Sequence, residues 1–424
     1  MTAQQAPAPH KAGRDIGFIE FVILCAAMMA LNALSIDPML PALPDIVRDL
    51  HVAHPNDRQL VITVYFLGMG AGAMLFGVLA DRFGRKPVLV GAMGFFVIST
   101  LACAAAQSFP MLLVARACAG FVAAAGRVIT VSIVRDRFQG DAMARVMSLI
   151  FAIFIIVPVV APAFGQAILW IAPWRWIFWV LGAIIALVMG WIMLRLPETL
   201  PRQNRLAINL REIGRTVTRV TTNRQAIGYM LAAGILSSCL VSFILSIQQI
   251  MFDRFDVPDL FPLIFAGIAI GMGAGSLVNS RLVARFGARR MSQSALFALI
   301  ALSLLRLGLL LAGLETLTNF ILLQAATMVT ISFTISNFSA ISMEPFAKGA
   351  GFASSFQTFL TTVISAILGG LVGGAFDGTT MPLILGLLGF GLSGLLVILW
   401  TERGKLFTRP HRDLLRVPDI EPLP

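Results

Sequence analysis

Charged side chains are scarce in this sequence and make up 12% of its 424 residues. A soluble domain carries about 25%. Uncharged stretches such as 88–108 and 381–400 match the ~20 residues that a helix needs to cross a bilayer. The composition therefore excludes an ordinary soluble domain and indicates an integral membrane protein with membrane lipids as its surroundings.

Motifs that carry enzyme chemistry are also missing. No HExxH, GxSxG or Walker A pattern occurs. The four histidines lie outside the apolar stretches, and the four cysteines lie inside them without paired or metal-like spacing. These residues are His10, His51, His54 and His411, and Cys25, Cys103, Cys118 and Cys239. We therefore expect neither an enzyme nor a metal site nor a cofactor, and an ion gradient is the available energy source.

Apolar runs separated by charged or turn-forming clusters predict twelve transmembrane helices and an all-α membrane protein. The predicted ranges are 16–40, 59–80, 88–107, 110–134, 146–170, 174–196, 224–250, 260–284, 291–314, 317–343, 351–376 and 380–401.

The basic residues test this topology, because cytoplasmic loops are enriched in Lys and Arg. With the N-terminus inside, most basic residues fall in cytoplasmic segments, including the tail 1–15, the central loop 197–223 and the tail 402–424. Few fall on the other side, namely Arg48, Arg58, Arg175 and Arg254. Both termini are predicted to be cytoplasmic, and topology explains the net charge of +11 without nucleic acid.

A repeated segment suggests an internal duplication. DRFGRKP at 81–87 follows the second predicted helix, and ARFGARRM at 284–291 follows the eighth. The polar connection between the sixth and seventh helices divides the chain into halves at 16–196 and 224–401. Two related six-helix halves are typical of secondary transporters, whose substrates bind near the membrane midplane between the repeats.

The segment GVLADRFGRKP (77–87) resembles the signature of the major facilitator superfamily, through Gly77, Asp81, Gly84, Arg85 and Lys86. Three further stretches resemble the bicyclomycin-resistance (Bcr/CflA) family of drug:proton antiporters within it. They are LSIDPMLPALPDI at 34–46, the run from ARACAGFVAAAG to IVRDRF, and VPVVAPAFGQAI at 157–168. The resemblance implies the major facilitator fold and a monomer of the bacterial inner membrane that exchanges protons for small hydrophobic drugs.

In the signature loop, Gly84 permits a tight reversal, and Arg85 and Lys86 hold the loop at the cytoplasmic surface. Asp81 ends a helix, where the helix dipole does not favour an anion. The resemblance implies that Asp81 engages the start of the eleventh helix, near GAGFASS at 349–355, as a conformational latch. The alternative is a solvated turn whose charges only set topology.

The fifth helix contains Pro158, Pro162 and Gly165. Prolines remove backbone hydrogen bonds and bend a helix, and glycine permits close helix contact. The stretch resembles the family motif that is associated with antiport. A simple packing kink is the alternative.

Ionisable side chains inside membrane spans are costly and are functional candidates. Asp37 lies near the outer end of the first helix and Arg116 lies in the outer part of the fourth. Burial disfavours a charged carboxylate and a nearby arginine favours it, which are the opposed influences that a proton carrier needs. The resemblance implies that Asp37 and Arg116 act in proton coupling. Alternatively, Asp37 caps its helix or pairs with Arg48.

Arg127 follows Arg116 by about three helical turns, so the two share one face. Related antiporters generally have a small neutral residue there. We expect Arg127 to line a substrate cavity, unless it reaches Asp136 near the cytoplasmic surface. Because the chain has 31 Phe and only two Tyr, the remaining cavity candidates are Tyr65, Phe151 and Phe154, together with the amide of Gln248.

These observations predict a proton-coupled exporter of small hydrophobic compounds, possible examples being phenicols, sulfonamides and bicyclomycin-like antibiotics. A proton-coupled transporter of an organic-anion metabolite is the alternative, since two intramembrane arginines suit an anionic substrate.

Overall fold

The computed structural model describes residues 16–205, 210–346 and 350–407. Every regular element within these residues is helical. Among them, 12 helices are long and apolar enough to cross a membrane, which confirms the predicted spans.

The spans of the first half are formed by α1 (Phe18–Leu34), α3 (Leu60–Phe83), α4 (Arg85–Ala104), α5 (Phe109–Arg137), α6 (Gly140–Ile171) and α7 (Arg175–Arg195). Those of the second half are formed by α9 (Arg224–Gln249), α10 (Phe261–Phe286), α11 (Ala288–Leu311), α12 (Leu317–Met343), α13 (Ala350–Gly374) and α14 (Met381–Thr401).

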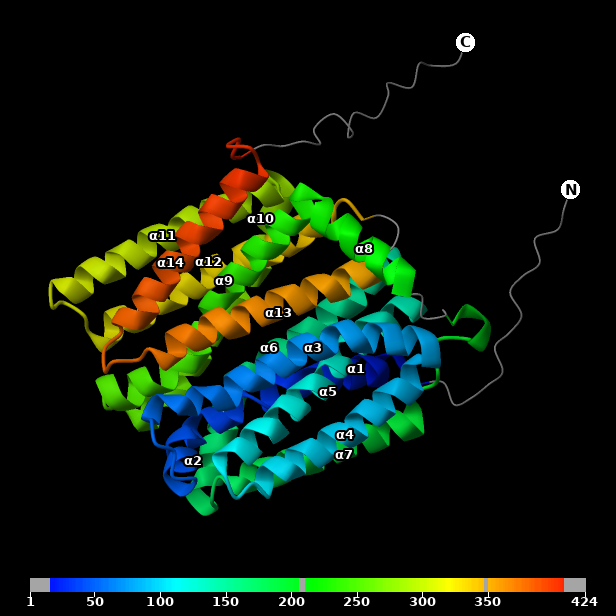
Figure 1. The fold of residues 1–424 in the computed structure, drawn as a ribbon, viewed down its shortest axis with the longest axis horizontal. Coiled ribbons are helices and arrows are strands. Elements are labelled where there is room, and N and C mark those ends of the chain that lie inside the picture. The colour runs from blue at the N-terminus through cyan, green and yellow to red at the C-terminus, as the bar shows by residue number, and fades with distance from the viewer. Residues whose placement is uncertain (1–15, 206–209, 347–349, 408–424) are drawn as a thin grey trace, which may run out of the picture.

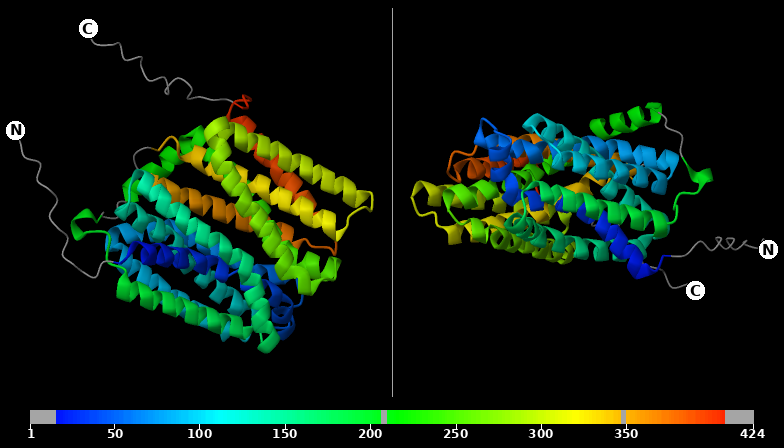
Figure 2. Two further views of the ribbon diagram at one scale, coloured as in Figure 1. Left: turned by 180° about the vertical axis from the view of Figure 1, so that it is seen from behind. Right: turned by 90° about the horizontal axis from the view of Figure 1, so that it is seen from below.

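The helices lie roughly side by side in two groups (Figures 1 and 2). Helices α1 and α3–α7 pack among themselves, and α9–α14 do the same. Two pairs join the groups, α3 with α13 and α6 with α10. Glycines allow the first pair to approach closely, since a methyl group added to Gly70 would lie 2.8 Å from the side chain of Val363.

The first span is interrupted rather than continuous, which corrects the single helix predicted over 16–40. Helix α1 ends at Leu34, a 3-10 helix η1 covers Asp37–Ala42, and a short helix α2 covers Leu43–Asp49. Prolines explain the interruption, because they lack the backbone N–H that a continuous α-helix would require. The acid at position 37 therefore lies at a break in the helix.

The central connection also departs from expectation, because 197–223 was predicted to be a polar loop. Helix α8 (Leu210–Thr222) forms within it and packs against α9 and α13. The sequence LREIGRTVTRVTT alternates apolar and arginine residues with a helical period. The composition of the segment does not reveal this helical pattern, because threonine and arginine make up most of its residues.

The two copies of the repeated segment adopt the same turn. Gly84 joins α3 to α4 with φ of 103°, and Gly287 joins α10 to α11 with φ of 86°. Side chains strongly disfavour this part of backbone space. Each reversal therefore depends on its glycine.

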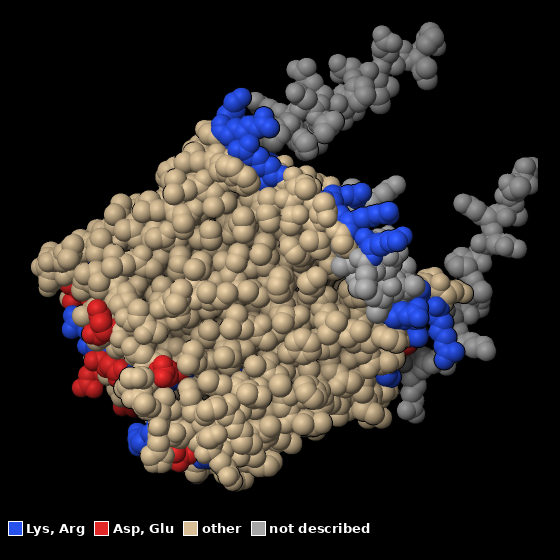
Figure 3. All heavy atoms as spheres, viewed as in Figure 1, with Lys and Arg blue, Asp and Glu red and all other residues tan. Residues whose placement is uncertain are grey.

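The charged side chains are distributed differently at the two ends of the molecule (Figure 3). Lys and Arg side chains predominate at one end, while Asp and Glu side chains lie beside a few basic ones at the other. We call the first the basic end; it contains the turns at Gly84 and Gly287, and the positive-inside rule predicts that it is cytoplasmic. The second is called the outer end.

Replacing Gly84 with Ala should destabilise the protein by about 1–3 kcal/mol, because of its positive φ. The added methyl would also lie 2.5 Å from Oε2 of Glu198. Thermal unfolding of the purified protein measures the loss. Gly190→Ala is the matched control, since it adds a methyl to α7 with nothing within 4 Å. Equal melting temperatures for both variants would contradict the prediction.

Candidate functional site

Asp37 begins the 3-10 helix η1 and is buried, with 5% of its surface exposed. Among the described residues, its carboxylate has neither an ion-pair partner nor a hydrogen-bond donor. A buried carboxylate without a partner is costly when charged. The predicted alternative of a pair with Arg48 does not form, because Arg48 pairs with Asp45 at 3.1 Å.

Arg116 holds the broken end of the first span. Its Nη1 donates to the carbonyl of Ser35 at 2.9 Å, and its Nε donates to the carbonyl of Val61 at 3.1 Å. Ser35 lies two residues before Asp37, so the arginine fixes the backbone that carries the acid. The side chains of Arg116 and Asp37 do not form an ion pair, and in this conformation Arg116 positions the acid through its backbone.

The ring of Tyr65 packs against the guanidinium group of Arg116. The guanidinium carbon lies 4.3 Å from the centre of the tyrosine ring, within the range of a cation–π contact. Tyr65 is fully buried, so in this conformation it does not face an open cavity as the sequence suggested. Gly120 packs directly on the backbone of Tyr65, which brings α3 and α5 together at this level.

The structure brings the proline-containing helix α6 against the turn that carries the acid. A methyl group added to Gly165 would lie 2.7 Å from Cα of Pro38, the residue next to Asp37. Pro158 and Pro162 lie within α6, about two turns and one turn before this contact, respectively. The predicted acid and the predicted antiport helix therefore meet at one point.

Arg127 lies on the inner side of α5. Cys118 helps to line an apolar groove of about 500 Å³ between α4 and α5, on the side of the helices that carries the exposed side chain of Val114. Arg127 follows Cys118 by about two and a half turns and so points about 180° away from that groove. Its side chain is nevertheless exposed. An inward-pointing, solvent-exposed arginine indicates an internal space that water reaches.

The alternative partner of Arg127 is occupied. Asp136 accepts hydrogen bonds from Nε of Arg85 and from the hydroxyl of Thr199, each at 3.1 Å. Within the described part of the chain, Arg127 has no hydrogen bond or ion pair.

The other residues predicted to line the cavity lie on different helices and do not form one site. Phe151 is 42% exposed and Phe154 is half-buried, both on α6. Gln248 is fully buried, and neither atom of its amide has a partner. It lies on the face of α9 with Leu245, which packs on Gly373 of α13. In this conformation Gln248 therefore faces a helix interface rather than open space.

In the signature loop, Asp81 pairs with Arg85 at 2.5 Å, and Arg85 also reaches Asp136. Glu198 accepts hydrogen bonds from the backbone N–H groups of Arg85 and Lys86, at 3.0 and 3.3 Å. The sequence did not point to Glu198, which follows α7.

The predicted latch partner of Asp81 is not engaged. No hydrogen bond or ion pair joins Asp81 to the described part of α13, and Gly349 lies outside the described residues. The helices themselves are close, because a methyl on Gly77 would lie 2.8 Å from Oγ of Ser355.

A polar seam joins the halves at the outer end, and sequence analysis did not predict it. Arg58 is buried and pairs with Asp253 at 2.6 Å. The amide of Gln249 lies 2.8 Å from the amides of both Gln59 and Asn56. Asn56 also donates to the carbonyl of Phe376 at 2.8 Å. Because the partners are far apart along the chain, no local pattern could reveal them.

Comparisons with known proteins agree with this architecture. A profile described as Major Facilitator Superfamily matches residues 22–363. An uncharacterized MFS-type transporter, YdgK of Bacillus subtilis, is 30% identical over 364 residues, which are 84% of this chain and 89% of the relative. A bicyclomycin resistance protein homolog of Haemophilus influenzae is 28% identical over 86% of this chain and 91% of its own. The multidrug resistance protein MdtL of Escherichia coli is 29% identical over 59% of this chain and 64% of its own.

Solved structures share the fold at low identity. The human organic anion transporter MFSD10 superposes with a TM-score of 0.62 at 18% identity, covering 91% of this chain and 100% of its own. A bacterial homolog of the human lysosomal transporter Spinster, in an inward-facing conformation, gives 0.64 at 15% identity, covering 92% and 96%.

Asp253→Asn should weaken the outer seam, because the buried guanidinium of Arg58 would lose its charged partner. Since Asp253 is half exposed, we expect about 1–2 kcal/mol, or about 5–30-fold in the population open at the outer end. Distances between spin labels at the exposed positions Ala53 and Leu314 measure this population.

The matched control for the seam is Asp259→Asn, which removes an exposed acid at the same end. Identical distance distributions in the Asp253 variant and the control would exclude a gating role for the ion pair.

Proposed function

Because this chain belongs to the Major Facilitator Superfamily, we propose that it is a drug:proton antiporter that exports small hydrophobic compounds by alternating access. Its location would be the bacterial inner membrane, and it would act as a monomer. The observation that carries the proposal is Asp37, a buried carboxylate in a membrane span that has no partner among the described residues and whose turn packs against the proline-containing helix α6.

The chemistry follows from the cost of a charge in hydrocarbon. A protonated Asp37 is neutral and tolerates burial, whereas a deprotonated Asp37 favours a conformation that exposes it to water. Each proton that enters through 100 mV contributes about 2.3 kcal/mol, besides the pH gradient. Arg116 would take part by holding the backbone of Ser35, which positions the acid.

We assign the present conformation as inward-facing. The outer end is closed by the seam that contains Arg58 and Asp253. At the basic end, Asp81 is paired with Arg85 and makes no bond to the described part of α13, and Arg127 is exposed on the inner side of α5. The latch would form when the halves close at the basic end.

The substrate class rests on the relatives. The names bicyclomycin resistance protein homolog and multidrug resistance protein belong to proteins about 30% identical to this chain, so we propose antibiotic-like substrates such as phenicols, sulfonamides or bicyclomycin. Phe151 and Phe154 on α6 are the aromatic candidates for contact with them.

One observation favours a second candidate, a proton-coupled transporter of an organic anion. The exposed guanidinium of Arg127 has no partner within the described part of the chain, and it is a suitable ligand for a carboxylate. Substrate charge separates the two candidates.

Asp37→Asn should abolish proton-driven export while the protein still folds, because an amide cannot carry a proton. Inverted vesicles with a pH-sensitive dye and a panel of phenicols, sulfonamides and cationic dyes provide the assay. The expected result is no proton release on substrate addition, as in vesicles without the protein.

Asp45→Asn is the matched control for the acid, since it removes a more exposed carboxylate from the same segment. Continued uphill export by the Asp37 variant under an imposed pH gradient would refute the role of Asp37.

Arg127→Ser should raise the export of a cationic dye relative to a neutral phenicol. Removal of ~1 kcal/mol of screened repulsion predicts a change of about fivefold in this ratio. Loss of transport of an organic anion, with drug export absent in the parent, would instead support the second candidate. An unchanged ratio of dye export to phenicol export would show that Arg127 does not line the substrate path. The control is Arg135→Ser, which removes an exposed arginine two turns further along α5.

A further inference from the structure

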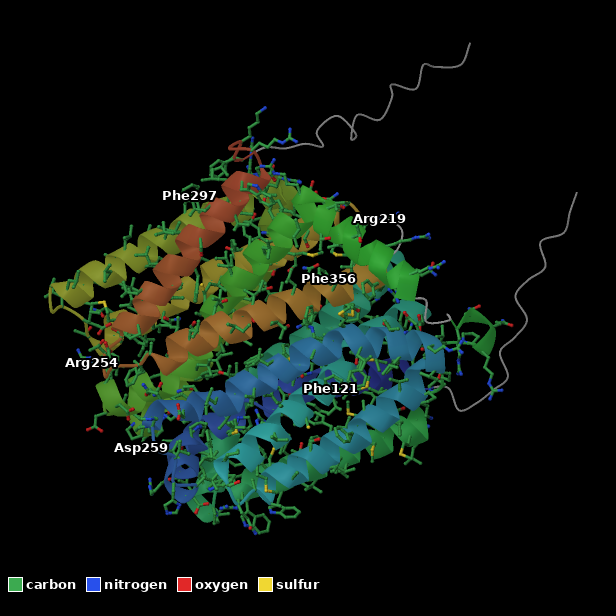
Figure 4. The ribbon with its side chains drawn as sticks, in the orientation of Figure 1. Phe121, Arg219, Arg254, Asp259, Phe297 and Phe356 are labelled. Carbon is green, nitrogen blue, oxygen red and sulfur yellow. The ribbon has the colours of Figure 1, made fainter. Side chains whose placement is uncertain are left out.

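Helix α8 carries a basic face that neither the transport cycle nor the fold requires. Its sequence contains three arginines at intervals of one turn, against one glutamate. Arg215 and Arg219 are exposed and have no hydrogen bond or ion pair from their side chains among the described residues. Figure 4 shows Arg219 projecting away from the helices, on the edge where Figure 3 shows a cluster of basic side chains.

The opposite side of α8 is docked on the second half. Val220 is fully buried among Ala226, Phe346 and Ala353, and Val217 is half-buried. The helix contacts α9 and α13 and runs across their ends at the basic end (Figure 1). The orientation of α8 is therefore fixed, with its arginines directed outward.

Helix α8 leads directly into a helix long and apolar enough to span a membrane. Asn223 alone separates the end of α8 from the start of α9, a membrane span, and its side chain caps α9 by accepting a hydrogen bond from the N–H of Ala226 at 2.9 Å. Because α8 is joined to a span by one residue and docks across the ends of α9 and α13, we expect it to lie at the level of the lipid headgroups.

Two acids of the second half at the basic end are already paired with another arginine. Glu344 and Glu402 are both engaged by Arg289, at 2.9 and 3.0 Å. Glu402 also accepts a hydrogen bond from the hydroxyl of Tyr229, at 2.6 Å. The positive charge of Arg215 and Arg219 is left for a ligand outside the protein.

We propose that α8 is a binding site for anionic phospholipid headgroups of the adjacent leaflet, with Arg215 and Arg219 as its ligands. An amphipathic helix with a docked apolar side and a basic side in the headgroup layer has the features that such lipids recognise. Two guanidinium groups one turn apart offer forked donors to the phosphate of one lipid or of two neighbours. Because α8 packs on α13, bound headgroups also hold the basic end of that helix in place.

The direct test is the lipid retained by the purified protein. Parent and Arg215→Gln/Arg219→Gln are equilibrated in detergent with equal amounts of phosphatidylglycerol and phosphatidylcholine, and the retained lipids are quantified by mass spectrometry. A contribution of ~1 kcal/mol per arginine predicts that the preference for phosphatidylglycerol falls by about 30-fold in the double variant.

The charge-matched control is Arg281→Gln/Arg403→Gln, which removes two exposed arginines from the same end but not from α8. We expect it to keep most of the parent's preference. An equal fall in both double variants would show a general effect of net charge and overturn the proposal, as would an unchanged preference in the α8 variant.

Free phosphate compounds are the other possible source of the same chemistry. An excess of glycerol 3-phosphate should not displace the retained phosphatidylglycerol, because the bilayer-level site also holds the lipid by its chains. Displacement would assign the site to soluble phosphates instead of lipid. None of these readouts requires transport, so the result stands apart from the antiport proposal.

Discussion

The hydrogen bonds from Arg116 to the carbonyls of Ser35 and Val61 are the interaction on which the candidate site depends. In a continuous helix, the carbonyl of Ser35 would accept from the N–H of Met39, but that N–H donates to Ile36 at the start of the 3-10 turn. A carbonyl without a partner is costly in hydrocarbon. The arginine satisfies it and so makes a break in a membrane span tolerable, and the break is what places Asp37 where it lies.

Helix α6 extends this local arrangement to the whole molecule. It contacts the 3-10 turn through Gly165 and Pro38, and it also packs against α10 of the other half. A single helix thus touches both the turn that carries the acid and the partner half. This spatial continuity gives a route by which a change at Asp37 can reach the interface, with proline-containing turns of α6 in between.

The two ends of the molecule differ in whether their polar contacts join the two halves. At the outer end, charged and amide side chains from both halves meet in the seam around Arg58 and Asp253. At the basic end, acids mostly pair within their own half, as Asp81 does with Arg85 and Glu344 does with Arg289. Bonds between halves must break when access alternates, whereas bonds within a half can persist, and the seam at the outer end is of the first kind.

The sequence by itself determined the number of membrane spans and the glycine turns, because these follow from local properties. The apolar length of each span and the need for positive φ at Gly84 are each encoded within a few residues. The acid at position 37 and the prolines beside it were also visible, as was the second copy of the turn at Gly287.

The sequence did not show which side chains and backbone groups contact one another. The partners of Arg116 are backbone carbonyls, which no sequence pattern marks, and Asp253 lies nearly half the chain away from Arg58. The exposure of Arg127 and the burial of Gln248 depend on how the two halves pack against each other. Tertiary structure decided these points, because contacts between distant segments depend on helix packing, and local periodicity leaves that packing open.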